Sequence, residues 1–208
     1  MSTLTDRLFE DGNDETFDPF AVFEEWFALA RQSEPNDPHA MSVATVDVHG
    51  MPDVRVVLLN ARDPRGFTFY TNFNSAKGEQ LLAHPKAAMA MHWKSLRRQV
   101  RARGPVEVVD ATESDAYFAS RARGSQIASS VSEQSHPLKS RQEMVNRVED
   151  LTKALGSSPV PRPPHWQGFR IVPLAIEFWK DGAFRMHDRM LFTRPAPGAP
   201  WTRTRLFP

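Results

Sequence analysis

Hydrophobic residues near the start of the chain recur at the spacing of one helix face. Asp18 and Pro19 supply a helix N-cap and a first-turn residue, and Pro35 ends the run. The apolar positions between them are Phe20, Phe23, Phe27 and Ala30. This pattern predicts an amphipathic helix packed on a core. Residues 1–17 are polar and lack such a period, and we expect a flexible N-terminal arm there.

Between residues 40 and 110 the hydrophobic period changes to that of strands. Short runs alternate between apolar and polar residues and are separated by turn signals, such as His49-Gly50. The predicted strands are 41–48, 54–61, 67–72, 87–93 and 97–109. Short turns favour antiparallel neighbours. A helix over 75–84, capped by Ser75, is predicted between the third and fourth strands.

The remaining sequence is first helical in pattern and then strand-like again. Helices are predicted over 111–130 and 140–156, and the proline-rich segment 159–166 is typical of an extended connector. The last predicted strands are 168–179, 183–194 and 201–207. This order indicates a mainly β protein with flanking helices (α+β), an antiparallel barrel built from a single domain over 18–208.

Charge and composition exclude several function classes. The chain has 26 Lys and Arg against 25 Asp and Glu, so no overall field favours nucleic acid or an anionic membrane. It has no cysteine, which excludes disulfides, thiolate metal sites and a cysteine nucleophile. The histidines lack paired metal-ligand spacing, and we expect no metal. No secretory signal or membrane-spanning stretch is evident, so we expect a soluble, cytoplasmic protein.

A cationic segment near the C-terminus is the first candidate site. If residues 183–194 form a strand, alternation places Arg185, His187 and Arg189 on one face. Trp179 lies just before the preceding turn, and an aromatic ring beside guanidinium groups suits a planar anionic ligand. The alternative is a solvated barrel face.

A second candidate lies in the helix predicted over 111–130. Tyr117, Arg121 and Ser125 are four residues apart and share one face if the helix is continuous. A phenol, a guanidinium and a hydroxyl together can hold a phosphate. The alternative is a half-buried tyrosine beside a solvated arginine.

A third candidate group lies on the predicted strands and at the start of the helix over 75–84. Its members are Arg55, Tyr70, Thr71, Ser75, Lys77 and Gln99. A helix N-terminus with free amide donors and a nearby lysine is a plausible phosphate pocket. The alternative is an ordinary capped helix.

The motifs of the chain, taken in order, resemble the pyridoxamine 5'-phosphate oxidase family from about Asp18 to the terminus. The series is RVVLLN, FYTN, SAKG, HWKSLRRQVRARGPVE, DAYFASRARGSQIA, SEQS, PRPPHWQGFR, IEFW, RMHDR and RLFP. The resemblance implies a flavin mononucleotide (FMN)-binding split barrel of Greek-key topology. It also implies a homodimer with FMN at the subunit interface, and oxidation of pyridoxamine or pyridoxine 5'-phosphate to pyridoxal 5'-phosphate with dioxygen reduced to hydrogen peroxide.

The resemblance also assigns roles to individual residues. The implied FMN contacts are Arg55, Val56, Val57, Leu58, Leu59, Tyr70, Thr71, Ser75, Lys77, Gln99, Gln134, Ser135, Trp179 and Arg189. The implied substrate contacts are Asn60, Tyr117, Arg121, Ser125, Arg185 and His187. Arg185, His187 and Asp37 are the implied catalytic residues.

The sequence departs from the family pattern at two phosphate-binding positions. Asn60 stands where the family usually has lysine, and Ala76 where it often has arginine. Each change removes a cation whose charge-assisted hydrogen bond is worth roughly 1.5 to 3 kcal/mol. Two alternatives therefore accompany the oxidase hypothesis: a related flavin enzyme acting on another planar substrate, and a non-catalytic flavin or pyridoxal-phosphate binding protein.

Overall fold

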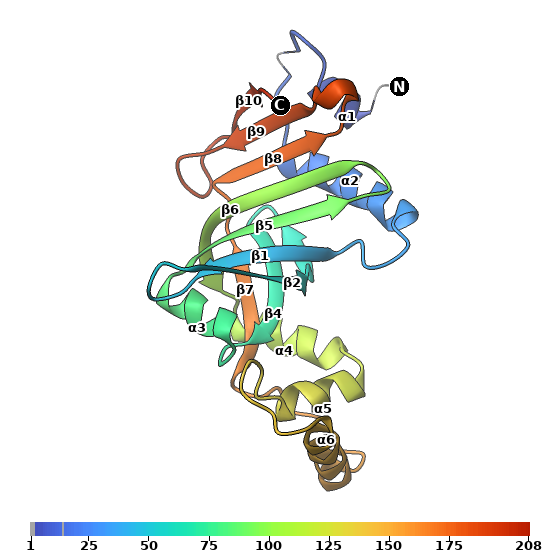
Figure 1. Ribbon diagram of the computed structural model, residues 1–208, viewed down its shortest axis with the longest axis vertical. Helices are drawn as coiled ribbons and strands as arrows, with labels where there is room; N and C mark the ends of the chain where they lie inside the picture. Colours follow the sequence, from blue (N-terminus) through green and yellow to red (C-terminus); the bar gives the residue numbers. More distant parts are fainter. Residues whose placement is uncertain (1–2, 14) are drawn as a thin grey trace.

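The chain forms one curled antiparallel sheet flanked by helices (Figure 1). The computed structural model describes residues 3–13 and 15–208. Within them the strands are β1 Ala40–Val46, β2 Pro52–Leu58, β3 Ala61–Asp63, β4 Gly66–Asn72, β5 Lys86–Trp93, β6 Arg98–Val108, β7 Trp166–Ile171, β8 Ala175–Lys180, β9 Asp188–Thr193 and β10 Thr202–Leu206. The main path runs β10-β9-β8-β6-β5-β1-β2, while β7, β4 and β3 form a second arm. The predicted mainly β, antiparallel fold is confirmed.

The long strand β6 joins the two arms of the sheet. Its first part, Arg98 to Arg103, pairs with β8, whereas Val106 to Val108 pair with β7. Gly104 lies between these parts, and a Cβ there would be 2.0 Å from the Val172 carbonyl oxygen. Only glycine permits this close approach of two backbones, which lets the sheet curl instead of remaining flat.

Six helices are present in the described part of the chain. They are α1 Leu4–Leu8, α2 Pro19–Ser33, α3 Ala76–Ala83, α4 Ala111–Ser120, α5 Arg123–Val131 and α6 Arg141–Leu155. Helix α2 packs against the sheet, whereas α4, α5 and α6 lie at the end of the molecule away from both termini (Figure 1). Among the described residues, no helix has the length and apolar character needed to cross a membrane.

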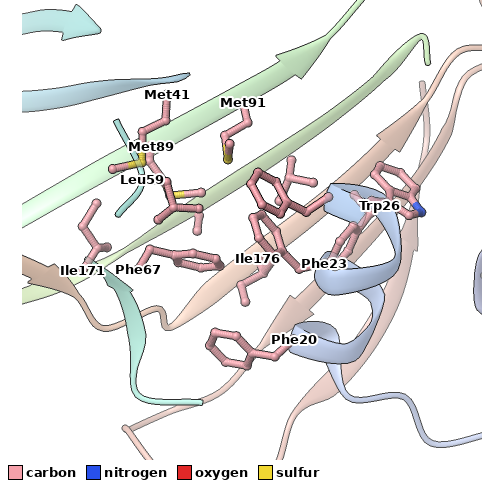
Figure 2. Packing of buried hydrophobic residues seen from close by; sticks show 14 of the residues in the cluster. Phe20, Phe23, Trp26, Met41, Leu59, Phe67, Met89, Met91, Ile171 and Ile176 are labelled. Atoms are coloured by element: carbon pink, nitrogen blue, oxygen red, sulfur yellow. The ribbon is translucent and has the colours of Figure 1, made fainter. Parts of the chain in front are cut away.

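The core lies between α2 and the sheet. Phe20 and Phe23 are buried, as the helical period predicts, and Trp26 is buried beside them; the three side chains meet Phe67 and apolar side chains from other strands (Figure 2). The ring centroids of Phe23 and Phe67 are 5.0 Å apart, in edge-to-face geometry. Burial of each such ring stabilises the fold by about 1.5 to 3 kcal/mol, so this helix fixes the sheet that carries the candidate site.

The N-terminal residues differ from the expected flexible arm. Helix α1 lies inside 1–17, and Leu8 is fully buried. The Glu25 carboxylate accepts hydrogen bonds from the Leu4 and Thr5 backbone amides, at 2.9 and 3.1 Å, and Trp26 Nε1 donates to Thr5 Oγ1 at 2.7 Å. This short helix has too few apolar residues to produce a visible period, and its stability comes from contacts with α2.

Three predicted elements are interrupted in the structure. The helix predicted over 111–130 breaks at Arg121, whose backbone is extended, with φ −74° and ψ 152°. The strand predicted over 168–179 divides into β7 and β8 around Pro173, which cannot donate a ladder hydrogen bond.

The third interruption concerns the predicted strand over 183–194. Strand β9 begins only at Asp188, and Ala183–Arg185 form a 3₁₀ turn. Phe184 and Arg185 have left-handed backbones, with φ 54° and 63°. The prediction that Arg185, His187 and Arg189 alternate along one strand face is therefore wrong, because only Arg189 lies on the strand.

Candidate active site

A cavity of about 870 Å³ opens between strands β2 and β4, the start of α3, and helices α4 and α5. This volume lies in the range of small-molecule sites. The sequence-predicted site residues that line it are Arg55, Val56, Val57, Leu58, Asn60, Tyr70, Thr71, Lys77, Tyr117, Arg121, Ser125, Gln134 and Ser135. The fold thus brings the broken-helix group and most of the strand group to one place, although Ser75 and Gln99 of the strand group do not line the cavity.

Lys77 is a buried cation at the floor of this cavity. Its Nζ donates hydrogen bonds to Thr71 Oγ1 at 2.9 Å, Ser75 Oγ at 3.1 Å and Gln134 Oε1 at 2.8 Å. All three acceptors are neutral, and among the described residues no carboxylate forms an ion pair with Lys77. Burial, reinforced by the nearby charge of Arg55, lowers the pKa of Lys77 to about 8. A ligand anion would supply the missing countercharge.

The start of α3 presents backbone donors beside Lys77. Ser75 caps the helix by accepting a hydrogen bond from the Gly78 amide, and Ala76 lines the cavity. A Cβ on Gly78 would be 2.2 Å from the Phe73 carbonyl oxygen, so only glycine permits this packing of the first turn. Ser75 itself is fully buried and does not line the cavity. It acts on the site by holding Lys77 and the helix start.

Arg55 reaches the same cavity from β2. Its guanidinium donates to Thr45 Oγ1 at 2.6 Å, Gln80 Oε1 at 3.1 Å and Asp53 Oδ2 at 2.5 Å. The Gln80 amide and this guanidinium lower the pKa of Asp53. Arg55 is therefore held in place by neighbours and is already partly neutralised.

Leu59, expected beside the cofactor with Val56 to Leu58, is not among the cavity-lining residues. Its backbone amide bonds to the His39 carbonyl at 2.8 Å just beyond the end of β2, and its side chain is buried in the main core (Figure 2). The three preceding residues do line the cavity.

Stacked aromatic rings form one wall of the cavity. The Tyr70 and Tyr117 ring centroids are 4.2 Å apart, and the Trp166 ring is nearly parallel to both, 5.2 Å from Tyr70 and 6.2 Å from Tyr117. Asn60 joins this wall to the backbone: its Oδ1 accepts from the Tyr70 amide at 3.1 Å, and its Nδ2 donates to the Tyr117 hydroxyl at 2.6 Å. A backbone amide can only donate a hydrogen bond, so the Asn60 atom that faces the Tyr70 amide must be the side-chain oxygen. The Asn60 side-chain nitrogen therefore faces the Tyr117 hydroxyl.

The break between α4 and α5 brings Tyr117, Arg121 and Ser125 to the cavity together. A continuous helix was expected to align them, but the extended backbone at Arg121 and the new helix start at Arg123 do so instead. The Arg121 guanidinium lies 4.8 Å from the Trp166 ring and donates to Ser129 Oγ at 2.9 Å. Burial lowers its pKa. No carboxylate from the described residues pairs with it.

A second group of predicted residues lies elsewhere on the sheet. Gln99, Trp179 and Arg189 are lateral partners on β6, β8 and β9 and therefore form one row. Arg189 Nε donates to Glu177 at 2.9 Å. Strand β8 is four steps from β2 in the order β8-β6-β5-β1-β2, or about 19 Å along the sheet at roughly 4.8 Å per step. This row does not reach the cavity within one chain.

The three predicted catalytic residues also lie outside the cavity. His187 packs against Trp179, with ring centroids 4.7 Å apart, and Arg185 is exposed in the turn before β9. Asp37 is exposed in the loop before β1 and has a left-handed backbone, with φ 42°.

Sequence reasoning missed several cavity residues. They are Asp53, Asn72, Ala122, Ser129, Ser132 and Trp166. Trp166 was assigned to a proline-rich connector, although it is the first residue of β7 and stacks in the aromatic wall. The available signal was the size of its side chain, because a tryptophan buries a large apolar area and is therefore often found in a core.

Comparisons with known proteins agree with this architecture. The family model described as pyridoxamine 5'-phosphate oxidase matches residues 30–153. A second, described as the pyridoxine 5'-phosphate oxidase C-terminal dimerisation region, matches residues 166–208. Among solved structures, PhzG from Burkholderia lata 383 in complex with tetrahydrophenazine-1-carboxylic acid has a TM-score of 0.86 and 30% identity, covering 96% of each chain. A pyridoxamine 5'-phosphate oxidase-related, FMN binding protein from Nostoc punctiforme shares the fold, with a TM-score of 0.76 at 16% identity, and covers 93% of this chain and all of that one.

Curated relatives are more similar in sequence. Proteins named pyridoxine/pyridoxamine 5'-phosphate oxidase are 55% identical in Rhizobium etli, over 93% of this chain and 94% of the relative, and 59% identical in Caulobacter vibrioides, over 92% and 85%. The motif order, the split barrel and these matches agree, and the chain belongs to the pyridoxamine 5'-phosphate oxidase family.

Proposed function

We propose that this protein is an FMN-dependent pyridoxine/pyridoxamine 5'-phosphate oxidase that produces pyridoxal 5'-phosphate. The observation that carries the proposal is the buried ammonium of Lys77, which lacks a carboxylate partner among the described residues and faces an aromatic-walled cavity. FMN supplies the redox chemistry when bound, by taking a hydride from the substrate and passing electrons to dioxygen, which leaves as hydrogen peroxide. The relatives at 55–59% identity carry the name of this activity.

The residues at the cavity floor fit the phosphate group of FMN. Lys77 and Arg55 provide cations, and the α3 N-terminus provides backbone amide donors and a favourable dipole. Thr71 and Gln134 hold the Lys77 ammonium in position. We assign the remaining floor and rim positions, Val56, Val57, Leu58, Tyr70 and Ser135, to further contacts with this cofactor.

The aromatic wall fits the substrate phosphate. Arg121 is a cation without a carboxylate partner among the described residues, and Tyr117 and Ser125 add hydroxyl donors nearby. Asn60 uses one acceptor position of the Tyr117 oxygen, so the Tyr117 O–H remains free to donate to a phosphate oxygen. We therefore assign Asn60 to the substrate-phosphate site, as a neutral group that orients the Tyr117 hydroxyl.

The distance between the cavity and the Gln99–Trp179–Arg189 row supports a homodimer with FMN at the subunit interface. A two-fold dimer can place the row of one copy over the cavity of the other, as it can Arg185, His187 and Asp37. Edge strand β2 exposes Val54 and Val56 to 64% and 65%, an apolar surface that a second copy would cover. The family model for residues 166–208 is described as a dimerisation region. We expect this dimer to work in the cytoplasm.

In this arrangement, the protein's own residues bind and orient the substrate. Arg185 would hold the substrate ring against the flavin plane, and His187 or Asp37 would accept a proton from the substrate amine or hydroxyl. The amine substrate loses a hydride and a proton to become an imine, which water hydrolyses to the aldehyde and ammonia. The alcohol substrate gives the aldehyde directly.

Absorption and activity of the purified protein test this proposal. We expect a yellow dimer that converts pyridoxamine 5'-phosphate to pyridoxal 5'-phosphate with equimolar hydrogen peroxide. FMN-loaded protein that turns over neither B6 phosphate at high concentration would contradict it. Bleaching of the flavin by other planar substrates under anaerobic conditions would then indicate a related oxidase, whereas tight ligand binding without redox cycling would indicate a binding protein.

The affinity for FMN is expected to fall as pH rises above about 8. The pKa of Lys77 is lowered to about 8 in the unliganded protein, and a phosphate dianion against the ammonium raises it. Binding above that pH therefore takes up a proton, and affinity declines by up to about tenfold per pH unit. Flavin fluorescence titrations measure this slope, with riboflavin, which lacks the phosphate, as control. Equal slopes for the two flavins would contradict the assignment of Lys77 to the phosphate.

Replacing Asn60 with lysine is expected to lower the KM for pyridoxamine 5'-phosphate by about tenfold without changing the product. The substitution adds a cation to the cavity wall, and a charge-assisted hydrogen bond is worth about 1.5 to 3 kcal/mol. Steady-state kinetics measure the effect, with Asn60→Ala as the matched variant that removes the hydrogen bond to Tyr117 and raises KM. An unchanged KM in Asn60→Lys would mean that the added cation does not reach the substrate phosphate.

A further inference from the structure

Asp181 lies beside His187 in the turn between β8 and β9. Its Oδ1 is 3.1 Å from His187 Nδ1, and the Gly182 backbone amide is 3.2 Å from the same nitrogen. Both side chains are mostly shielded, with 17% of Asp181 and 22% of His187 exposed. Asp181 was not among the residues predicted from the sequence, and it is not in the cavity.

The position of Asp181 is fixed by its own contacts. Its carboxylate forms an ion pair with Arg97 through Oδ2, and its backbone amide donates to the Arg97 carbonyl at 3.0 Å. The next residue, Gly182, packs so closely that a Cβ would be 2.0 Å from the Met186 carbonyl oxygen. The turn is therefore tightly packed. It holds Asp181 Oδ1 near the His187 imidazole, and Arg97 holds Asp181 Oδ2.

These contacts decide which ring nitrogen carries the proton. A neutral imidazole has one N–H, and Nδ1 has a single in-plane direction for either a proton or a lone pair. A lone pair on Nδ1 accepts the hydrogen bond of the Gly182 amide but is repelled by the Asp181 carboxylate oxygen 3.1 Å away, whereas a proton on Nδ1 is attracted to that oxygen. Because the full negative charge of the carboxylate acts more strongly than a hydrogen bond between neutral groups, the Nδ1–H form is favoured.

We propose that Asp181 is a positioning residue that holds His187 in its Nδ1–H form, so that Nε2 offers a lone pair to a hydrogen-bond donor on the substrate. No described residue hydrogen-bonds Nε2. The donor it suits is the amine or hydroxyl on the carbon that is oxidised, and in this respect the inference rests on the proposed function. The Trp179 ring, 4.7 Å from the imidazole, limits ring rotation.

A purely structural role for Asp181 is the competing explanation. The Arg97–Asp181 ion pair links the hairpin before β6 to the end of β8 and would stabilise the sheet without affecting His187. Only the tautomer of His187 distinguishes the two explanations, because loss of a surface ion pair changes stability alone. The test therefore needs a readout at the imidazole nitrogens.

Nitrogen-15 NMR of the histidine side chains provides that readout on the full-length protein. Spectra are recorded at about pH 8.5, where an ordinary imidazole is neutral, and the His187 signals are assigned by their absence in His187→Gln. We expect the wild type to carry its proton on Nδ1. In Asp181→Asn, Arg97 accepts no hydrogen bonds and selects the amide oxygen, which turns the amide NH₂ toward Nδ1, and the proton is expected to move to Nε2.

Asp188→Asn is the matched control, because it removes another carboxylate from the same segment, one that pairs with Arg205 at 3.0 Å. It is expected to leave the His187 tautomer unchanged. Two results would overturn the proposal: a proton on Nε2 in the wild type, or an unchanged tautomer in Asp181→Asn. A third result would also overturn the proposal: the same tautomer change in Asp188→Asn. The change would then follow from any loss of charge in this turn and not from Asp181.

Kinetics add the functional consequence. In protein that retains its flavin, Asp181→Asn is expected to lower kcat for pyridoxamine 5'-phosphate oxidation by about tenfold to a hundredfold, the effect of one charge-assisted hydrogen bond. The KM should change less, because the residues assigned to the substrate phosphate, Tyr117, Arg121 and Ser125, are not altered. If Asp181→Asn moves the His187 proton to Nε2 but leaves kcat unchanged, the proposed contact between His187 Nε2 and the substrate would be overturned. A wild type without turnover would contradict the proposed function, whereas the NMR result would still decide the role of Asp181.

Discussion

Lys77→Met is expected to yield colourless protein, with an FMN affinity at least about a hundredfold weaker than that of the wild type. The substitution removes the buried ammonium and its charge-assisted contact with the phosphate while keeping a side chain of similar length. One such contact contributes about 1.5 to 3 kcal/mol, and the shielded position of Lys77 favours the upper end of this range or beyond. Flavin content after purification and fluorescence titration measure the loss.

The matched control is Lys86→Met, an exposed lysine on β5 that is expected to leave flavin binding unchanged. Thermal unfolding without ligand separates binding from folding. Burial of an ammonium without a countercharge is unfavourable, so unliganded Lys77→Met is expected to be about as stable as the unliganded wild type. If Lys77→Met is colourless because it is unfolded, its loss of flavin does not test binding. Lys77→Gln, which keeps a hydrogen-bond donor, then provides the comparison.

Arg121→Met is expected to raise the KM for pyridoxamine 5'-phosphate by about tenfold to a hundredfold while FMN remains bound. Arg121 lies in the cavity without a carboxylate partner among the described residues, so its charge is available to the substrate phosphate. Its contact with Trp166 is replaced by the methionine thioether, which also packs against aromatic rings. Steady-state kinetics of the two proteins at equal flavin content measure the change.

Arg123→Met provides the comparison for this second variant. Arg123 lies two residues away, but its guanidinium donates to the Gly156 and Ser158 carbonyls, at 2.7 Å each, and not to the cavity. We expect a small loss of stability and an unchanged KM. If both variants raise KM equally, the effect comes from the junction between α4 and α5, and Arg121 does not bind the phosphate directly.

The sequence alone determined the approximate positions of most strands and which face of α2 is buried. Alternation and helical period depend on neighbours only a few residues apart, so Phe20, Phe23 and Phe27 could be assigned to the core directly. The cap of α3 at Ser75 was equally local. The ordered motifs also identified the family, because many matched segments in one order are far more specific than any one of them.

Two elements predicted from a plausible period have a different local geometry, because tertiary contacts overrode that period. The helix through Tyr117 and Ser125 breaks at Arg121, which stacks on Trp166 and bonds to Ser129. The expected strand at Arg185 is a left-handed turn. Neither interruption carries a proline or glycine at the break itself, so the sequence contained no local signal.

Only the tertiary structure decided how the site residues are distributed. Lys77 is buried among groups that are distant in sequence, such as Gln134, which comes from a loop 57 residues later in the chain, and this burial lowers its pKa. The separation of Arg189 from the cavity depends on strand order, which no periodic pattern encodes. A periodic pattern shows which face of its own helix or strand a side chain occupies. A binding site depends instead on which helices and strands become neighbours, and the packing of the whole chain determines this.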